Sequence, residues 1–535
     1  MTRREAPARP GPRAQPVPEG RKTAGPGRRR ARGPVSLTVL ACLVGLLALS
    51  PLGYVVGQAA GAGWLPTWRL VTKPATLALL GHTFSLTLAV VAAGIVLGGG
   101  GAWLLERTKL PARRFWAVLL PLPIAVPAFV SAFAWVSVLP AMSGFLGAFT
   151  VMTLATYPLV LLPTAAVLRD MDPALEEVAA SLGQGPWRIF WRTVLPQAMP
   201  ALAGGALLVA LETLAEFGAF SMLNYSTFTT TIYDQYNLTF DGPVASMLAM
   251  VLVFACLVLL IAELRVRGRR RYAHVGGGVD RRQSRRSLGR TTPLVMTGLG
   301  TLTVAALGVP AGIIAYWITY GRTGRLPLDS LGAAVATSLG LSLAAALTTT
   351  AAALPVALLV VRHRSALALL IDRATYLAHG LPGVVVALAL VVLSIRYLRP
   401  LYQTPALLVI AYVIVFLPLA VVGVRASMAR VSAVLPEAAR SLGVGPFRAF
   451  LRVVLPLIGP GAGAAAALVF LGTMNELTVT LMLAPPGLQT LSTVIWTDTT
   501  NLDYPAAAPY AAVMIAVCAL PTYLLTNRLG RPAAA

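Results

Sequence analysis

The sequence has few charged residues, and few of these are acidic. Asp, Glu, Lys and Arg make up 12% of the 535 residues, and 19 acidic residues stand against 43 Lys and Arg. A soluble globular chain carries about 25% charged residues. Because 57% of the residues are hydrophobic and the mean hydropathy is +0.76, the composition excludes a set of solvated domains and indicates repeated membrane spans.

Cysteine and lysine are also scarce. The three cysteines, Cys42, Cys256 and Cys518, all lie in apolar runs, which excludes a disulfide framework and a cysteine-based metal site. Lysine occurs at three positions, and none of them follows a glycine. A phosphate-binding loop of the Walker A type needs a Gly-Lys pair, so the sequence predicts no ATP hydrolysis by this chain. We expect no catalytic residue, no metal ligand and no cofactor.

The apolar residues form about twelve runs, each long enough to cross the roughly 30 Å hydrocarbon core of a bilayer as a helix. The runs are continuous rather than alternating, which favours helices over strands. The sequence therefore predicts an all-α polytopic membrane protein with about 12 transmembrane helices. The expected spans lie near 36–58, 83–105, 115–138, 145–168, 201–223, 243–263, 293–318, 336–360, 374–394, 404–424, 461–484 and 507–526.

The basic residues are unevenly distributed about these spans. If the N-terminus is cytoplasmic and twelve spans follow, all but six of the 43 Lys and Arg lie on the cytoplasmic side. This positive-inside pattern predicts a multi-pass protein of the plasma (inner) membrane with both termini in the cytoplasm. The anionic lipid of the bilayer is a sufficient partner for the net charge of +24, and no nucleic acid is expected. The six basic residues expected outside are Arg69, Lys73, Arg322, Arg325, Arg396 and Arg399.

The chain repeats itself. Residues 177–200 and 437–460 are identical at fourteen of 24 positions, and the match continues downstream, where Glu216 pairs with Glu476. Both halves enter the membrane from the cytoplasm, so we expect two parallel six-helix repeats. The predicted parts are a disordered basic cytoplasmic tail (1–34), a first transmembrane domain (35–264), a basic cytoplasmic linker (265–292), a second transmembrane domain (293–527) and a cytoplasmic tail (528–535).

The repeated block between the fourth and fifth spans of each half predicts two short helices that meet at a tight elbow. Good helix formers fill 175–182, Gly183 suits the left-handed residue that ends such a helix, and Pro186 suits the first turn of the next one. In the second helix, apolar residues at helical spacing predict one apolar face, with arginines elsewhere. These residues are Trp187, Phe190, Trp191 and Val194 with Arg188 and Arg192, and in the second copy Phe447, Phe450, Leu451 and Val454 with Arg448 and Arg452.

Such a block can be an amphipathic membrane anchor, with aromatic residues in the headgroup layer and arginines on phosphates. A single copy would favour that interpretation. Glycines and prolines at the same offsets in both halves are instead expected when each copy fits the same rigid partner. The repetition therefore favours docking.

The block resembles the cytoplasmic loop of permease subunits of binding-protein-dependent ABC importers. It carries E-A-A-x-x-x-G, nine further residues and I-x-L-P, with Val178 in place of the first Ala of one copy and Thr193 or Val453 in place of Ile. In that family the loop is a coupling helix seated in a groove of the ATPase. The resemblance implies a MetI-like type I importer fold, two ABC ATPase subunits, one per loop, and a separate extracytoplasmic substrate-binding protein. The implied coupling residues are Glu177, Ala179, Gly183, Pro186, Arg188, Arg192, Leu195 and Pro196, and Glu437, Ala439, Gly443, Pro446, Arg448, Arg452, Leu455 and Pro456.

Two such halves in one chain look most like the permeases of ferric-iron importers, and the segments DPALEEVAASLG, HGLPG and MNELTVTLML agree with that group. Thiamine importers are the closest alternative, with polyamine, sulfate and phosphonate importers more distant. The resemblance implies alternating access driven by a partner ATPase. A twelve-helix secondary transporter and a non-transporting membrane scaffold are rival classes that leave the repeated docking block unexplained.

Acidic residues and prolines within the spans need an explanation, because polar groups in hydrocarbon are costly. Glu216 and Glu476 either line the translocation path near the axis between the halves or form interhelical hydrogen bonds that fix packing. Pro127 and Pro382 either break path-lining helices or kink packed ones. The sequence leaves both pairs of alternatives open.

Overall fold

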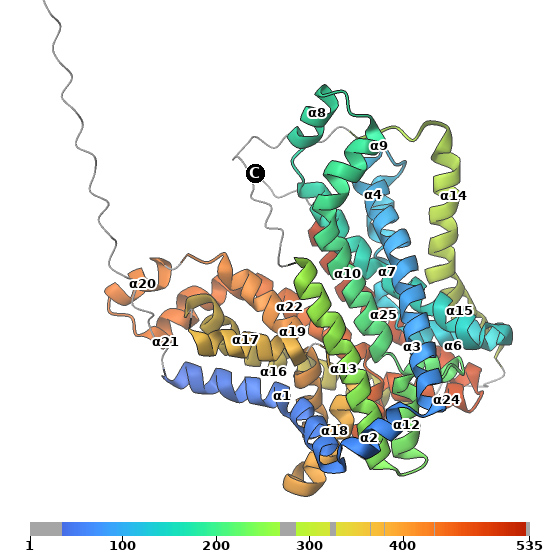
Figure 1. The fold of residues 1–535 in the computed structure, drawn as a ribbon, viewed down its shortest axis with the longest axis vertical. Coiled ribbons are helices and arrows are strands. Elements are labelled where there is room, and N and C mark those ends of the chain that lie inside the picture. The colour runs from blue at the N-terminus through green and yellow to red at the C-terminus, as the bar shows by residue number, and fades with distance from the viewer. Residues whose placement is uncertain are drawn as a thin grey trace, which may run out of the picture.

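The computed structural model describes residues 35–267, 285–321 and 328–530, apart from 364, 379 and 433 (Figure 1). These residues form helices, with no β-structure among them beyond one isolated bridge between Thr108 and Arg286. Ten helices in the described part are long and apolar enough to cross a membrane, and two further bent pairs raise the number to twelve if each is one span. The predicted tail 1–34, most of the linker and the end of the chain lie outside the described residues.

The described residues of the first half form thirteen α-helices, and in several cases two or more short helices together make up one span. They are α1 (Val35–Ala62), α2 (Trp64–Val71), α3 (Pro74–Gly94), α4 (Gly100–Arg107), α5 (Arg113–Leu119), α6 (Ala128–Val138), α7 (Gly144–Asp170), α8 (Ala174–Ser181), α9 (Pro186–Ile189), α10 (Leu195–Ala215), α11 (Gly218–Met222), α12 (Phe228–Asn237) and α13 (Gly242–Arg267). A five-residue π-helical turn joins α3 to α4, and another joins α9 to α10.

The second half repeats this order with small differences. Its helices are α14 (Thr292–Thr303), α15 (Val309–Tyr320), α16 (Leu328–Arg362), α17 (Ala366–Ala378), α18 (Gly383–Tyr397), α19 (Pro405–Ala429), α20 (Val434–Ser441), α21 (Pro446–Ala449), α22 (Leu455–Asn475), α23 (Thr478–Leu483), α24 (Leu491–Thr500) and α25 (Tyr504–Gly530). Again π-helical turns join α14 to α15 and α21 to α22.

The third span of each half is broken rather than kinked. The segments before and after Pro127 are bent by 87°, and those before and after Pro382 by 107°. Each proline is the residue that precedes the second helix, α6 or α18, with φ near −58°, the value its ring imposes. The spans predicted near 115–138 and 374–394 are therefore found as bent pairs, and of the two alternatives for each proline the structure has the break.

The fifth span of each half is also interrupted. In the first half its helix begins in the repeated block, runs without a gap from Pro186 to Ala215, and ends before Glu216. In the second half the helix runs from Pro446 to Asn475 and ends before Glu476. The expectation of continuous spans over 201–223 and 461–484 is wrong, because a carboxylate in each span interrupts the helix instead of continuing it.

The first helix of each half packs on the other half. The helix α1 contacts α16, α17 and α18, and α15 contacts α6. Gly45 of α1 lies against Ile371 of α17, and the Trp317 indole of α15 donates a hydrogen bond of 2.9 Å to Ser137 Oγ of α6. The two repeats are thus interlocked rather than merely side by side.

The two repeated blocks lie far from each other. In Figure 1, α8 and α9 lie at the top of the molecule and α20 and α21 at the far left. The short helices α12 and α24 lie together at the lower end. The repeated blocks therefore occupy separate tips, away from the end where the two halves meet through α12 and α24.

Candidate functional site

The elbow of each repeated block is built by a glycine in left-handed geometry. Gly183 has φ 77° and Gly443 has φ 84°. The Gly183 amide donates to Ala180 O at 2.9 Å, and the next amide donates to Ala179 O at 3.1 Å. The second copy has the matching pair of bonds at 3.0 and 3.1 Å. These paired bonds are the Schellman motif, so each helix, α8 or α20, ends in the way that the sequence predicts.

The second helix of each elbow contains a π-helical turn, at Phe190–Val194 or Phe450–Val454. The cause lies in the repeated Leu-Pro pair. Pro196 and Pro456 have no N–H for the usual bond to the fourth preceding carbonyl, and the Leu195 and Leu455 amides bond five residues back instead. The turn joins each elbow directly to the fifth span.

The aromatic side chains of the first elbow lie together but are not covered. The rings of Trp187 and Trp191 lie 6.1 and 5.5 Å from the Phe190 ring, as expected for one apolar face. Trp187 and Trp191 are 73% and 59% exposed, whereas Ile189 is buried. In the second copy Phe447 is likewise 73% exposed, while Val454 is buried. Each elbow therefore presents large apolar side chains outward.

The charged residues of the elbows are also turned outward. The four predicted arginines Arg188, Arg192, Arg448 and Arg452 are exposed. The side chains of Glu177 and Glu437 are exposed too, and neither makes an ion pair within the described residues. The sequence-based role of Glu177 and Glu437 in orienting the elbow from within the chain therefore finds no support in these contacts. They are available to a partner.

An ion pair that the sequence analysis missed holds the first elbow. Arg107 at the end of α4 binds Glu176 of α8 at 2.6 Å and donates to Met171 Sδ at 3.0 Å. The Arg107 guanidinium lies almost fully buried, 5.9 Å from the Trp103 ring centroid. In the repeat, Arg107 aligns with Arg362 at a shift of 255, and this match could have singled out the arginine. Glu176 aligns with Pro436 at a shift of 260, so the second half has no carboxylate at that place.

The end of the linker also contacts the first elbow. The Arg286 amide donates to Arg107 O at 3.0 Å, and the Lys109 amide donates to Arg286 O at 2.8 Å. This backbone bridge lies directly beside the ion pair of Arg107 and Glu176. The segment that joins the two halves thus forms backbone hydrogen bonds next to the ion pair that holds the first elbow.

The structure brings the predicted path residues together where the two halves meet. Glu216 Oε1 accepts a hydrogen bond of 2.8 Å from the Ala219 amide, and Glu476 Oε1 accepts one of 2.9 Å from the Val479 amide. Each carboxylate therefore caps the short helix that follows it, α11 or α23. Gly218, two residues after Glu216, packs against Leu477, the residue after Glu476, so the carboxylates of both halves share one region.

The broken third spans meet the same region. A Cβ atom at Gly383, directly after Pro382, would lie 3.0 Å from Glu476 Oε1. In the first half, Gly218 of α11 packs on Phe129, two residues after Pro127. The breaks at the prolines and at the carboxylates therefore belong to one central arrangement in each half. The hydrogen-bonding role of the two glutamates is observed, but their bonds cap the following helices rather than cross between spans.

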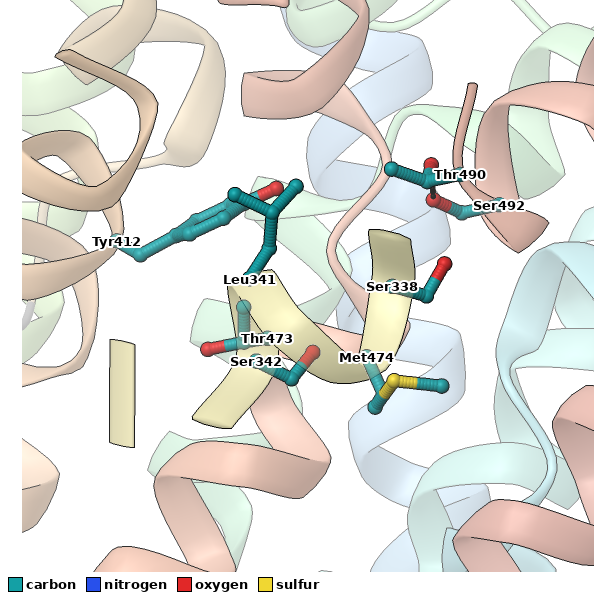
Figure 2. Close-up of a pocket in the computed structure, with 8 residues that line it drawn as sticks. All are labelled: Ser338, Leu341, Ser342, Tyr412, Thr473, Met474, Thr490 and Ser492. Carbon is teal, nitrogen blue, oxygen red and sulfur yellow. Dashed lines mark hydrogen bonds between the residues drawn. The ribbon is translucent and has the colours of Figure 1, made fainter. Parts of the chain in front are cut away.

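A small polar cavity lies beside Glu476 in the second half. Its volume is about 10 Å³, which suits roughly one water molecule. Tyr412 OH and Thr480 Oγ1 share a hydrogen bond of 2.6 Å, and Thr480 donates to the backbone carbonyl of Glu476. Figure 2 shows the residues around the cavity, Ser338, Leu341, Ser342, Tyr412, Thr473, Met474, Thr490 and Ser492.

Two interlocked helix repeats, with broken spans at their junction and matched elbows at two separate tips, define a polytopic membrane permease made of two fused halves. The comparisons place it further. The family described as binding-protein-dependent transport system inner membrane component matches the chain twice, over residues 91–271 and 349–531, and the chain belongs to this family.

Its relatives differ in how much of the chain they match. The Fe(3+)-transport system permease protein FbpB 2 of Haemophilus influenzae is 38% identical over 501 residues, which cover 92% of this chain and 98% of that protein. The sulfate transport system permease protein CysT of Escherichia coli is 32% identical over 252 residues, covering 43% of this chain and 90% of that protein. Sulfate permease 2 of the Chlamydomonas reinhardtii chloroplast is 30% identical over 37% of this chain and 60% of that protein.

Proposed function

We propose that this chain is the membrane-spanning subunit through which an ABC importer carries ferric iron into the cytoplasm. The observation that carries the proposal is the match to an Fe(3+)-transport permease over nearly the whole of both chains. The sulfate permease CysT matches only about half of this chain. Two fused halves are thus a feature that this chain shares with the iron permease.

The acidic side chains at the junction of the halves support a cationic cargo. Glu216 and Glu476 lie where the halves meet, and Glu212 lies one helical turn before Glu216. Carboxylates there would favour a cation over an anion such as sulfate. We propose that Glu216 and Glu476, together with the breaks at Pro127 and Pro382, form the translocation path and its gate.

The energy would come from a separate ATPase. Two ABC ATPase subunits would each seat one elbow, with the exposed Trp187 or Phe447 in a groove and the exposed glutamates and arginines at its rim. ATP binding would draw the two subunits together. Because each elbow continues into a fifth span without a gap, its movement would be transmitted to the broken end of that span beside Glu216 or Glu476.

The orientation in the membrane follows from this proposal. Both elbows, the tail 1–34, the linker 265–292 and the tail 528–535 would lie in the cytoplasm, and the domains 35–264 and 293–527 would hold six spans each. An extracytoplasmic binding protein would deliver the iron from the other side. Cysteine labelling at Gly185 and Gly445 in right-side-out vesicles would test this orientation, since neither position should react with an impermeant reagent.

Uptake of radiolabelled ferric iron tests the proposed function. Proteoliposomes would hold the permease and its ATPase, with an Fe(III)-loaded binding protein outside. We expect uptake that depends on ATP, on the binding protein and on this chain, and no uptake of sulfate or thiamine. An ATPase without its Walker A lysine is the control. Uptake of sulfate or thiamine in place of iron would contradict the proposed substrate, and uptake without any ATPase would contradict the proposed class.

A further inference from the structure

Two exposed apolar side chains occupy matching places at the end of the molecule away from the elbows. Phe240 lies in the loop between α12 and α13, and Leu502 lies in the loop between α24 and α25. They are 85% and 71% exposed. In Figure 1 their helices α12 and α24 lie together at the lower end. The helices also touch, since the rings of Tyr233 and Trp496 are 6.2 Å apart.

The backbone of each loop is held in an unfavourable conformation. Phe240 has φ 56° and Leu502 has φ 61°, in the left-handed region that bulky residues rarely adopt. Glycine or asparagine would serve the turn alone with less strain. A large apolar side chain at both positions therefore needs a reason other than the shape of the loop.

The hydrogen bonds around each loop are similar in the two halves. Each short helix begins with a capping box, at Thr227 or at Thr490. Each loop then ends in an aspartate whose Oδ1 caps the following span. Asp241 accepts from the Val244 amide at 3.1 Å, and Asp503 accepts from the Ala506 amide at 3.2 Å. The two apolar side chains are thus presented on matched, fixed supports.

The surroundings of these side chains favour a protein over the membrane surface. Phe240 is followed by Asp241, and Leu502 by Asp503, with Asp234 or Asp498 on the preceding helix. Segments that anchor in the headgroup layer carry Lys and Arg beside their apolar residues, since the lipid is anionic. An apolar side chain with an aspartate next to it in the chain is instead suited to a protein hollow with a basic rim.

We infer that Phe240 and Leu502 are two docking points for the extracytoplasmic binding protein, one for each of its lobes. The inference rests on the proposed function for the presence of that partner, and the family description names the transport system as binding-protein-dependent. Binding proteins of this class close around their ligand by a hinge between two lobes. Two fixed docking points, one on each half of the permease, can hold the two lobes at the separation of the closed form.

Affinity measurements test the assignment. The permease–ATPase complex in nanodiscs would be titrated with a purified, Fe(III)-loaded binding protein, and Kd measured for Phe240→Asn, Leu502→Asn and the double variant. Asparagine tolerates left-handed geometry, so the loops keep their shape while the apolar surface is removed. We expect each single variant to raise Kd about tenfold and the double variant about a hundredfold, as for hot-spot residues.

Leu238 provides a matched control. It is 69% exposed in the same loop as Phe240, but its φ is −101° and threonine stands at its place in the other half. We expect Leu238→Asn to leave Kd within about twofold of wild type.

A double variant with unchanged Kd would overturn the assignment, and reduced membrane insertion with unchanged Kd would point to lipid as the true contact. Failure of the proposed function gives a different result. A wild-type complex that binds the loaded protein but takes up no iron contradicts the substrate and leaves the docking points in place.

Discussion

The two elbows have the same shape but are held in different ways. Both have the left-handed glycine, the Schellman bonds and the π-helical turn before Leu-Pro. The first is tied to its half by the ion pair between Arg107 and Glu176 and by the bridge to Arg286. The second has no such tie among the described residues, and Arg362 donates only to the Val431 carbonyl at 3.1 Å.

The first elbow is also the more firmly packed of the two by its apolar side chains. Ala179 and Ile189 of the first elbow join a buried cluster with Ala102, Leu168 and Met171 of the membrane domain. In the second elbow no residue of α20 is buried, although Ala449 of α21, at the place of Ile189, is. The shared sequence thus sets the form of the elbow, while residues outside the repeat set how firmly it is held. We infer that the first elbow is the fixed one of the pair and the second is the one with more freedom to move.

Bulky substitutions at the two glycines test the shared form, and we expect the largest effect there. A Cβ at Gly183 or Gly443 would meet no atom within 4 Å, so any loss must come from the backbone conformation. Left-handed geometry costs a residue with a Cβ about 1–2 kcal/mol, and a β-branched valine is still less suited to it. We expect Gly183→Val with Gly443→Val to lower ATP-driven uptake at least a hundredfold without loss of insertion. Gly443→Val alone should be the more harmful single change.

Gly185 and Gly445 serve as controls for this experiment. Their φ values are −68° and −58°, which any residue can adopt, and a Cβ there also meets open space. Alanine at both should keep near-normal uptake. If valine at 183 and 443 were tolerated equally well, the elbows would have no part in coupling.

Removing the arginines tests the difference between the elbows. Arg107→Ala leaves the partly buried Glu176 without its partner, and a hydrogen bond to a charged group contributes about 1.5–3 kcal/mol. We expect about tenfold lower iron uptake and weaker retention of the ATPase during purification. Arg362→Ala should change both by less than about twofold, because it loses one bond to a carbonyl. Equal losses from the two variants would mean that the elbows are held alike after all.

A double-mutant cycle separates the ion pair from the other contacts of Arg107. Glu176→Gln alone should produce most of the loss seen for Arg107→Ala, and the double variant should be no worse than Arg107→Ala alone. Additive losses would assign the effect to the Met171 and Trp103 contacts instead.

Tyr157 and Tyr412 occupy matching positions in the two halves, within the spans α7 and α19, and allow the same comparison there. Tyr157 OH donates to the Leu120 carbonyl at 2.7 Å, and both residues are fully buried. Tyr157→Phe leaves that carbonyl without its side-chain partner, and we expect a loss of about 1–2 kcal/mol in unfolding free energy. Tyr412→Phe should lose about 0.5–1 kcal/mol, because Thr480 keeps its bond to Glu476 and the adjacent cavity can admit water. Unfolding in detergent with denaturant measures both, and the reverse order would contradict this account.

The sequence predicts the two repeats and both elbows because these depend on local rules. A glycine at a helix end and a proline in a first turn need only neighbouring residues to be interpreted. Helical spacing predicts the apolar face but not its exposure, because covering it depends on distant segments or on a partner. The breaks at Glu216 and Glu476 were within reach, since interrupted spans at matching places in two halves are typical of transport sites.

The exchange of first helices and the ion pair of Arg107 depend on contacts between distant segments. Hydropathy gives α1 and α15 as spans but does not state which half each one joins. In the same way, 69 residues separate Arg107 from Glu176, and only the fold brings them together. The alignment of the two copies shows proline at 436 where the first copy has Glu176. Without a structure, this difference could not be connected with an ion pair.

Introducing a glutamate at position 436 of the second elbow should have the smallest effect, and it tests directly whether the absent ion pair makes that elbow looser. Pro436 is the third residue of α20, as Glu176 is the third residue of α8. Pro436→Glu restores an N–H, suits the positive end of the helix, and places a carboxylate where it can reach Arg362. We expect about 1 kcal/mol of added local stability, which corresponds to about fivefold slower amide exchange across 437–443.

Pro436→Gln separates the charge from the loss of proline, because it restores the same N–H without a carboxylate. Exchange in this variant should stay close to wild type, and Arg362→Ala should remove the gain of the glutamate variant. If glutamine slowed exchange as much as glutamate, the proline rather than the absent ion pair would account for the looser second elbow. A slower exchange with glutamate alone, accompanied by slower ATP-driven uptake, would instead show that transport depends on one elbow being fixed and the other free.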